Sequence, residues 1–215
     1  DHKAARHDLA ALAANRAYVL ATWGEEAVTE FFLHVAEDLL MKEIAALKGA
    51  GCPDEAVQHS LEVARKSLEI ASRVNIPVDK HLLARGALFH DLGKAKTYGM
   101  EHGEIGAQMA REMGLEEAII QIILKHIRGG LTEAEAKELG LPVRDYTLRT
   151  PEEKIVIYAD RMVDIYTDGI VPGADEHTAE TRFAEILGSY EKYGKNAPTL
   201  QRYLALNAEI QGWLS

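Results

Sequence analysis

The chain has 215 residues, enough to bury a sizeable core, and its contents of 47% hydrophobic and 27% charged residues are ordinary for a globular protein. Its 24 basic and 34 acidic residues give a net charge of −10, which excludes a broad basic surface for duplex nucleic acid and requires a local cation for any anionic substrate. Cys52 is the single cysteine and no apolar run approaches the roughly 20 residues of a membrane span, so a cytoplasmic protein is expected, with any metal held by imidazole and carboxylate.

Apolar residues at helical spacing predict an N-terminal helix at 8–20 and a second helix at 24–48, which ends at the breaker 49–53. Helix-start and helix-stop residues then predict a series of shorter helices, at 53–74, 80–89, 101–113, 116–126, 132–139 and 154–166. Two further helices, 176–193 and 198–214, finish the chain. The sequence contains neither strand-like alternation nor a repeat, so the predicted fold class is all-α.

Two of these helix starts carry specific capping signals. Thr132 with Glu135 forms a capping box, and Thr150 followed by Pro151 matches an N-cap with proline at the first helical position. The segments between the helices are predicted as loops, at 94–100, 128–130, 140–149 and 169–175.

The predicted helix 80–89 ends in a histidine and an aspartate side by side, His90 and Asp91, followed by Gly93 and Lys94. Adjacent side chains on a helix diverge by about 100°, so the pair is explained if both reach toward one centre from a helix end. A divalent metal is the natural centre. The alternative is an ordinary helix C-terminus with a glycine stop signal.

Other histidines also occupy inward positions. His59 has Val63 four residues on, and His126 lies on the most apolar helix face of the chain, while His102 opens the helix after the 94–100 loop. A buried imidazole needs partners for both nitrogens, and a metal satisfies one of them. For His59, a core histidine hydrogen-bonded to a carbonyl is the alternative interpretation, and His34 is interpreted as a satisfied or solvated histidine.

Asp160 is the matching carboxylate farther along the chain. Val156 and Ile157 precede it by one turn, and a carboxylate on that face is costly to bury unless it is paired or bound to a cation. A salt bridge is the alternative to a metal, but the adjacent Arg161 cannot readily provide it because neighbouring helical side chains diverge.

Along the chain the candidates follow the order His, His-Asp, His, His, Asp. This pattern resembles that of the HD superfamily of metal-dependent phosphohydrolases. The resemblance is carried by four motifs, at 59–64, 87–94, 102–107 and 155–161, and covers about 53–166. The chain is most similar to the small stand-alone HDIG-type proteins, although its third motif letter is Leu92 rather than isoleucine. The resemblance implies an HD-domain helical bundle, with 1–50 as an N-terminal extension packed on the core, 51–168 as the metal-binding core and 169–215 completing the same domain.

The resemblance also implies the metal ligands, which are His59, His90, Asp91, His102, His126 and Asp160. Asp91 would bridge two divalent ions, with His102 and His126 completing the second site. Iron is the expected metal, with manganese, zinc, nickel, cobalt or magnesium as substitutes, because mixed imidazole and carboxylate ligation suits such cations better than calcium.

The implied activity is hydrolysis of a phosphomonoester or phosphodiester, in a nucleotide or another small phosphate ester, by a metal-activated water. Asp91 and Lys94 are the candidate catalytic residues. Lys94, Arg128 and Arg161 are candidate phosphate-binding cations, with Tyr98 at the pocket rim; a solvated loop lysine is the alternative for Lys94. No duplex nucleic acid or membrane partner is expected, and the oligomeric state stays open.

Two rival functions stay open as well. The six ligands equally suit an HD-fold di-iron oxygenase that cleaves a C–C or C–P bond, so the ligand set alone does not separate the two. The third reading is a non-catalytic HD domain that senses a nucleotide.

Overall fold

The computed structural model describes residues 14, 16–17, 19–21, 24–26 and 37–214. Most of the predicted helix 8–20 lies outside the described residues, as do residues 27–36 of the predicted helix 24–48, which include His34. Helix α2 (Glu37–Gly49) ends at the predicted breaker. The described residues form helices, turns and loops without a strand, so the predicted all-α class is confirmed.

The helices of the predicted core have nearly the expected bounds. They are α3 (Asp54–Arg73), α4 (Lys80–Phe89), α5 (His102–Glu112), α6 (Glu117–Lys125), α7 (Glu133–Glu138) and α8 (Pro151–Thr167). Short 3-10 helices follow α4 and α6, namely η1 (Leu92–Ala95) and η2 (Ile127–Gly129). The predicted loop 94–100 therefore begins inside a 3-10 turn, which keeps the chain compact directly after the His90-Asp91 pair.

Local capping explains where several helices begin. The side chain of Asp79 accepts a hydrogen bond of 3.0 Å from the Leu82 amide at the start of α4. Thr132 forms the predicted capping box with Glu135, and Thr150, predicted as an N-cap, also completes a capping box, with Glu153. The capping interactions fix the residue at which each helix begins. They therefore also fix which residues of the helix lie level with the neighbouring helices.

The predicted helix 176–193 is wrong as a single element. It is divided into α9 (Glu176–Thr181), α10 (Phe183–Ser189) and α11 (Glu191–Gly194), and α12 (Ala197–Leu214) follows. The backbone leaves the helical region at Arg182 (φ −111°, ψ 18°) and at Tyr190 (φ −122°, ψ 100°). Gly188 weakens the helix before the second break, and tertiary packing, which buries Tyr193 completely, overrides the local periodicity.

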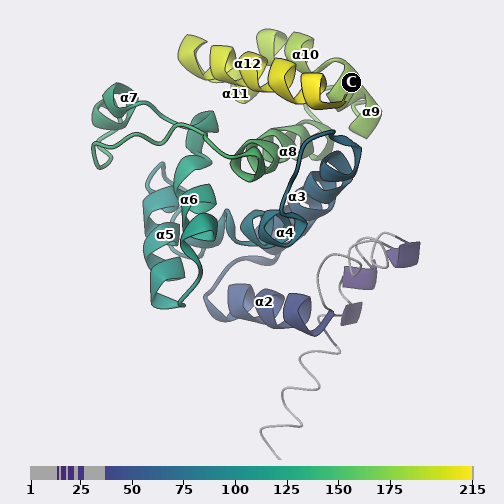
Figure 1. Ribbon diagram of the computed structural model, residues 1–215, viewed down its shortest axis with the longest axis vertical. Helices are drawn as coiled ribbons and strands as arrows, with labels where there is room; N and C mark the ends of the chain where they lie inside the picture. The colour runs from purple at the N-terminus through teal and green to yellow at the C-terminus, as the bar shows by residue number, and fades with distance from the viewer. Residues whose placement is uncertain (1–13, 15, 18, 22–23, 27–36, 215) are drawn as a thin grey trace, which may run out of the picture.

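Helix α8 is the centre of the arrangement (Figure 1). It packs against α3, α4 and α6 on one side and against α12 and α11 on the other. The helices α5 and α6 form an adjacent pair, and α4 packs on α6. The ends of α4 and α6 and the start of α5 therefore meet beside α8, which is where the candidate residues lie.

Gly93 and Gly106 allow the backbone of η1 to approach the backbone of α5 closely. A Cβ atom on Gly93 in η1 would lie 1.8 Å from the carbonyl oxygen of His102, and one on Gly106 in α5 would lie 2.8 Å from the Gly93 nitrogen. The backbone of η1 is thus in direct contact with the backbone of α5, and this contact holds His102 next to Asp91.

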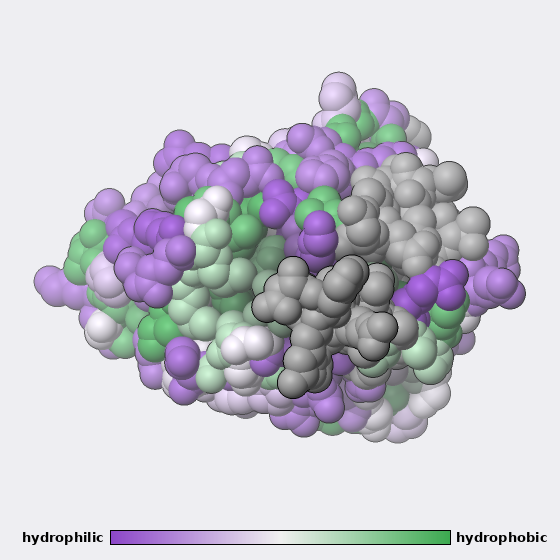
Figure 2. Space-filling model, turned by 90° about the horizontal axis from the view of Figure 1, so that it is seen from below, coloured by the Kyte–Doolittle hydropathy of each residue, from purple (hydrophilic) through white to green (hydrophobic). Residues whose placement is uncertain are grey.

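The face seen from below is mostly hydrophilic, with apolar surface gathered in a hollow beside the grey residues (Figure 2). The core itself is apolar, and the α8 residues Ile155, Val156 and Ile157 are completely buried. Among the described residues, no helix is both long and apolar enough to cross a membrane.

Candidate metal centre

The six predicted ligands come from five helices or their ends and converge beside α8. They are His59 in α3, His90 and Asp91 directly after α4, His102 at the start of α5, His126 directly after α6 and Asp160 in α8. These residues form three groups, and within each group the potential ligand atoms all lie within 4.8 Å of one another. One of the groups also includes Asp164. The structure brings every one of the predicted ligands to this centre.

Three of the histidines share one local geometry that fixes the direction of the ring. In each, Nδ1 donates to the backbone carbonyl three residues earlier, at 2.6 Å for His90 and 2.7 Å for both His102 and His126. A neutral ring whose Nδ1–H is engaged in this way presents a bare Nε2 lone pair on its other side.

These Nε2 lone pairs lack suitable protein partners. The Nε2 atom of His90 is buried without a hydrogen-bond partner among the described residues. Those of His102 and His126 face each other at 2.7 Å. Two lone pairs at that distance repel unless a cation or a proton lies against them, so the arrangement has the chemistry of a metal site.

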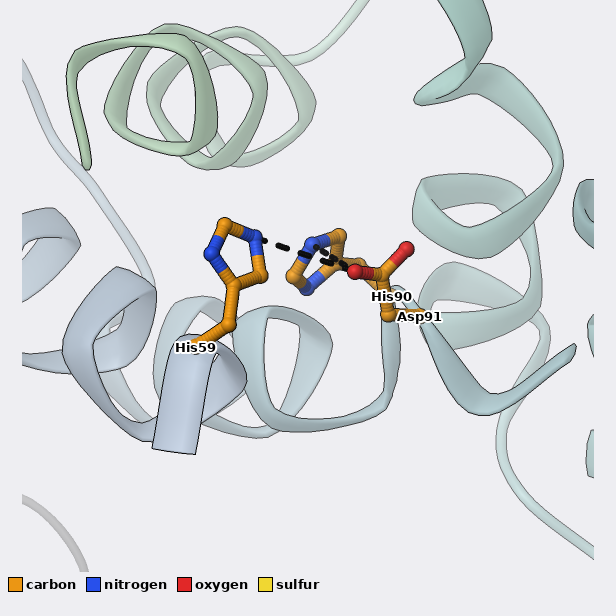
Figure 3. Close-up of side chains that lie close together, drawn as sticks. All are labelled: His59, His90 and Asp91. Atoms are coloured by element: carbon orange, nitrogen blue, oxygen red, sulfur yellow. Dashed lines mark ion pairs between the residues drawn. The ribbon is translucent and has the colours of Figure 1, made fainter. Parts of the chain in front are cut away.

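Asp91 faces both pairs of imidazoles with opposite carboxylate oxygens. Its Oδ2 lies 3.4 Å from His90 Nε2 and 3.7 Å from His59 Nε2, and both rings are turned toward it in Figure 3. Its Oδ1 lies 3.3 Å from His102 Nε2 and 3.2 Å from His126 Nε2. A carboxylate in this position can bridge two cations.

The spacing of these atoms fits divalent metals. Bonds of about 2.1 Å hold neighbouring ligands about 3.0 Å apart at octahedral angles and about 3.4 Å apart at tetrahedral angles. The four distances from Asp91 to the imidazoles lie close to this range, as does the 3.5 Å from His90 Nε2 to Asp160 Oδ1. With the orphaned Nε2 atom of His90, this spacing shows that the nitrogen and oxygen atoms present could hold a metal ion.

The electrostatics favour positive charge at the same point. Burial alone would lower the pKa of His90, but the charges of Asp91 and Asp160 outweigh it and raise that pKa to about 9. Burial alone would raise the pKa values of the two carboxyls, but the histidine charges and hydrogen bonds hold both well below their usual range. Burial lowers the pKa of His126, which keeps this ring neutral and available as a ligand.

A cavity opens at the metal centre, and Asp91, His126 and Asp160 are among the residues that line it. The predicted phosphate-binding cations also line this cavity, but their partners differ. Lys94 donates to Asp91 Oδ2 at 2.6 Å. Arg161 donates to Asp164 Oδ2 at 3.0 Å rather than to its neighbour Asp160, from which it was expected to diverge. The Arg128 side chain also lines the cavity. Tyr98 is 57% exposed and donates to Glu55 at 3.2 Å, and it is not among the residues that line the cavity.

The sequence interpretation missed two polar residues of the cavity. Asp164 lies one turn after Asp160 in α8, and burial together with the charge of Asp160 raises its pKa to about 6. Its signal was present in the sequence, because residues four apart share a helix face. Lys195, which follows α11, gave no such signal, since it lies about 35 residues beyond the last motif.

Comparison with known proteins identifies the family of the chain. The model of the HD domain family matches residues 56–163. An uncharacterized protein of Methanocaldococcus jannaschii is 36% identical over 177 residues, which are 80% of this chain and 97% of that protein. Ribonuclease Y of Pseudothermotoga lettingae is 40% identical over 154 residues, 71% of this chain but 26% of the ribonuclease.

A further partial similarity is to a tRNA methyltransferase. The tRNA (cytidine(56)-2'-O)-methyltransferase of Picrophilus torridus is 38% identical over 119 residues, 55% of this chain and 34% of the methyltransferase. The chain thus spans about a third of the methyltransferase and about a quarter of the ribonuclease.

Among solved structures, the HD domain of the L. monocytogenes phosphodiesterase PgpH, in complex with cyclic-di-AMP, has a TM-score of 0.51 and 17% identity. The similarity covers 79% of this chain and 95% of that domain, and it supports the fold alone.

Proposed function

The chain belongs to the HD domain family, and on that premise we propose that it is a metal-dependent phosphohydrolase that cleaves a nucleotide or another small phosphate ester. The observation that carries the proposal is the ring geometry of His90, His102 and His126. Each ring is anchored to a backbone carbonyl through Nδ1 and directs Nε2 at Asp91. Three such rings around one buried carboxylate are costly without a bound cation, and so support a role in metal binding.

We propose that the centre holds two divalent ions, with Asp91 between them. His59, His90 and Asp160 would complete one position, and His102 and His126 the other. Iron is the proposed metal, because a shell of four imidazoles and two carboxylates suits borderline transition metals, and manganese, zinc, nickel, cobalt or magnesium are the substitutes. When bound, such ions supply an acidified water and neutralise charge on the phosphate oxygens.

The side chains of the cavity would bind and orient the ester. Burial lowers the pKa of Lys94, but the charge of Asp91 outweighs this effect and raises that pKa overall, so the ammonium group stays charged. This group could bind a phosphate oxygen beside the metal ligands. Arg161 is held by Asp164 and by the ring and hydroxyl of Tyr203, the latter at 3.2 Å, and so presents a fixed guanidinium. The proposed products are an alcohol and a phosphate that carries the oxygen of water.

The names of the relatives favour phosphoesters over other substrates. Ribonuclease Y and the PgpH phosphodiesterase are named for cleavage of phosphodiesters. The partial match to the tRNA methyltransferase, over 34% of that protein, does not favour methyl transfer here, because a cluster of imidazoles and carboxylates suits a metal-activated water.

The test is elemental analysis of the purified protein followed by hydrolysis of p-nitrophenyl phosphate and bis(p-nitrophenyl) phosphate. Two metal ions per chain and hydrolysis that is lost on chelation and restored by metal are expected. Asp91→Asn should lose metal and activity. Asp175→Asn, which keeps an N-cap side chain at α9 and does not line the metal cavity, is the matched control and should keep both.

Hydrolysis that survives complete removal of metal would contradict the proposal. Consumption of oxygen, with a mixed-valent iron spectrum and no phosphate release, would instead identify an oxygenase on the same ligands.

A further inference from the structure

Arg128 and Lys195 share an unusual backbone. Among the described residues they are the two non-glycine positions with positive φ, with φ 49° and ψ 33° at Arg128 and φ 60° and ψ −81° at Lys195. Each such conformation is strained for an L-residue and persists only where surrounding structure imposes it. Both residues carry a long cationic side chain, and both line the metal cavity.

The conformation of Arg128 is imposed from helix α12. Arg202 donates to the Arg128 carbonyl oxygen from Nε at 3.2 Å and from Nη2 at 3.0 Å, and its Nη1 pairs with Glu135 at 2.7 Å. The next residue, Gly129, has φ 73° and fits against the Tyr203 ring, which a Cβ atom would meet at 3.2 Å. The C-terminal helix thus fixes the turn that carries the Arg128 side chain.

The two cations also differ from their neighbours in lacking anionic partners. Lys94 pairs with Asp91, and Lys192 pairs with Asp168 at 2.5 Å. The guanidinium of Arg128 and the ammonium of Lys195 make no hydrogen bond or ion pair with the described residues, and Arg128 Nε is buried without an acceptor. Burial and the repulsion of Arg161 and Arg128 lower the pKa of Lys195, so an anion at this point would relieve the crowding of positive charge.

The cavities indicate where such an anion would lie. Arg128 and Lys195 line both the metal cavity, of about 210 Å³, and a second cavity of about 390 Å³. Pockets for small-molecule ligands usually measure about 300 to 1,000 Å³, so the metal cavity alone is small for a nucleotide. A ligand with one phosphate at the metal ions would pass these two cations on its way into the second cavity.

We propose that Arg128 and Lys195 form an anion site beside the metal centre, which binds a second phosphate group of the substrate. The ligand class is therefore a nucleotide or similar ester with two phosphate groups. The inference rests on the proposed function for the position of the first phosphate, while the anion site itself rests on two unpartnered cations at the junction of two cavities.

The test is calorimetric binding to the metal-loaded protein of three probes: AMP, ADP and adenosine 3′,5′-bisphosphate. At least one of the two-phosphate probes should bind about tenfold or more tightly than AMP. A preference for ADP indicates adjacent phosphates, and a preference for the bisphosphate indicates phosphates on opposite sides of the ribose. The preference should shrink as salt is added, because exposed charges are screened.

Variants assign the preference to these side chains. Lys195→Gly removes the cation and suits the positive φ, so it should fold and lose about tenfold in affinity for the preferred probe, with AMP binding changed less than twofold. Arg128→Asn should also weaken binding of the preferred probe about tenfold, and it should fold because asparagine tolerates the left-handed region. Lys96→Gln removes an exposed lysine outside both cavities and should keep the preference.

Equal or undetectable binding of all three probes to the wild-type protein would overturn the second site. Equal losses for AMP and the preferred probe in Lys195→Gly would also overturn it, because both cations would then contact the first phosphate. Failure of the proposed function is a different result. In that case the binding preference and its loss in Lys195→Gly persist, but no phosphoester is hydrolysed.

Discussion

Gly93 is the position at which one methyl group should separate the two halves of the metal centre. In Gly93→Ala the new Cβ atom would lie 1.8 Å from the His102 carbonyl oxygen and 2.9 Å from the Gly106 nitrogen. Both obstacles are backbone atoms, so no side chain can rotate away, and η1 must move from α5 by about 1 Å or more. Metal–ligand bonds tolerate only about 0.2 Å, so Asp91, which immediately precedes η1, can no longer serve both pairs of imidazoles.

The expected loss of stability is about 3 kcal/mol, the upper part of the usual range for overpacking, because the contact is made by rigid backbone. Urea unfolding with a chelator present should detect it as a midpoint lowered by about 1 M or more, without a contribution from bound metal. Elemental analysis of the untreated variant should show a loss of metal. Gly188→Ala is the matched control, since a Cβ atom there meets nothing within 4 Å. A Gly93→Ala protein with the wild-type urea midpoint and metal content would refute the reasoning.

His126→Ala should lower the metal content from two ions per chain to one, because this ring contributes to the group with Asp91 and His102 only; unchanged content by elemental analysis would contradict its role. Lys94→Gln should weaken turnover of phosphoesters about tenfold or more at unchanged metal content, and wild-type kinetics would exclude Lys94 as a substrate contact. The raised pKa of His90, about 9 against 6.5, means that a bound proton stabilises the metal-free protein below about pH 6.5 and that this contribution is lost as the pH rises through about 9. Metal must displace that proton, so metal affinity measured by calorimetry should rise from pH 6 to pH 9, with proton release.

The ligands could be predicted from the sequence because each lies at a helix end or on a helix face with a strong local signal. His90 and Asp91 follow a helix whose bounds, Lys80–Phe89, were predicted correctly from its cap and its apolar run. Thr150 and Glu153 place the start of α8, and the helix period then carries Asp160 to the inner face. The interpretation of Gly93 as a stop signal was incomplete. The contact that requires a glycine there is with α5, about ten residues away, and local rules do not describe it.

The remaining parts of the site depend on contacts between distant segments. Arg128 was identified only as a cation two residues after His126, and nothing nearby indicated that Arg202 would fix its backbone from α12. Lys195 follows a short helix that the sequence assigned to one long helix, so its turn and its side-chain direction were both unforeseen. These positions are set by tertiary packing, which helix propensity and periodicity do not encode.

The negative net charge makes the unpaired cations decisive for binding. A charge of −10 repels an anionic substrate, but at physiological ionic strength this repulsion is screened beyond about 8 Å, so the groups around the cavity determine the local field. Lys94 and Arg161 are largely neutralised by Asp91 and Asp164, with which they pair directly. Arg128 and Lys195 have no such partners, and each holds its place at a cost in backbone strain. The selection of an anion at this cavity therefore depends most on the two residues that lie outside every recognised motif.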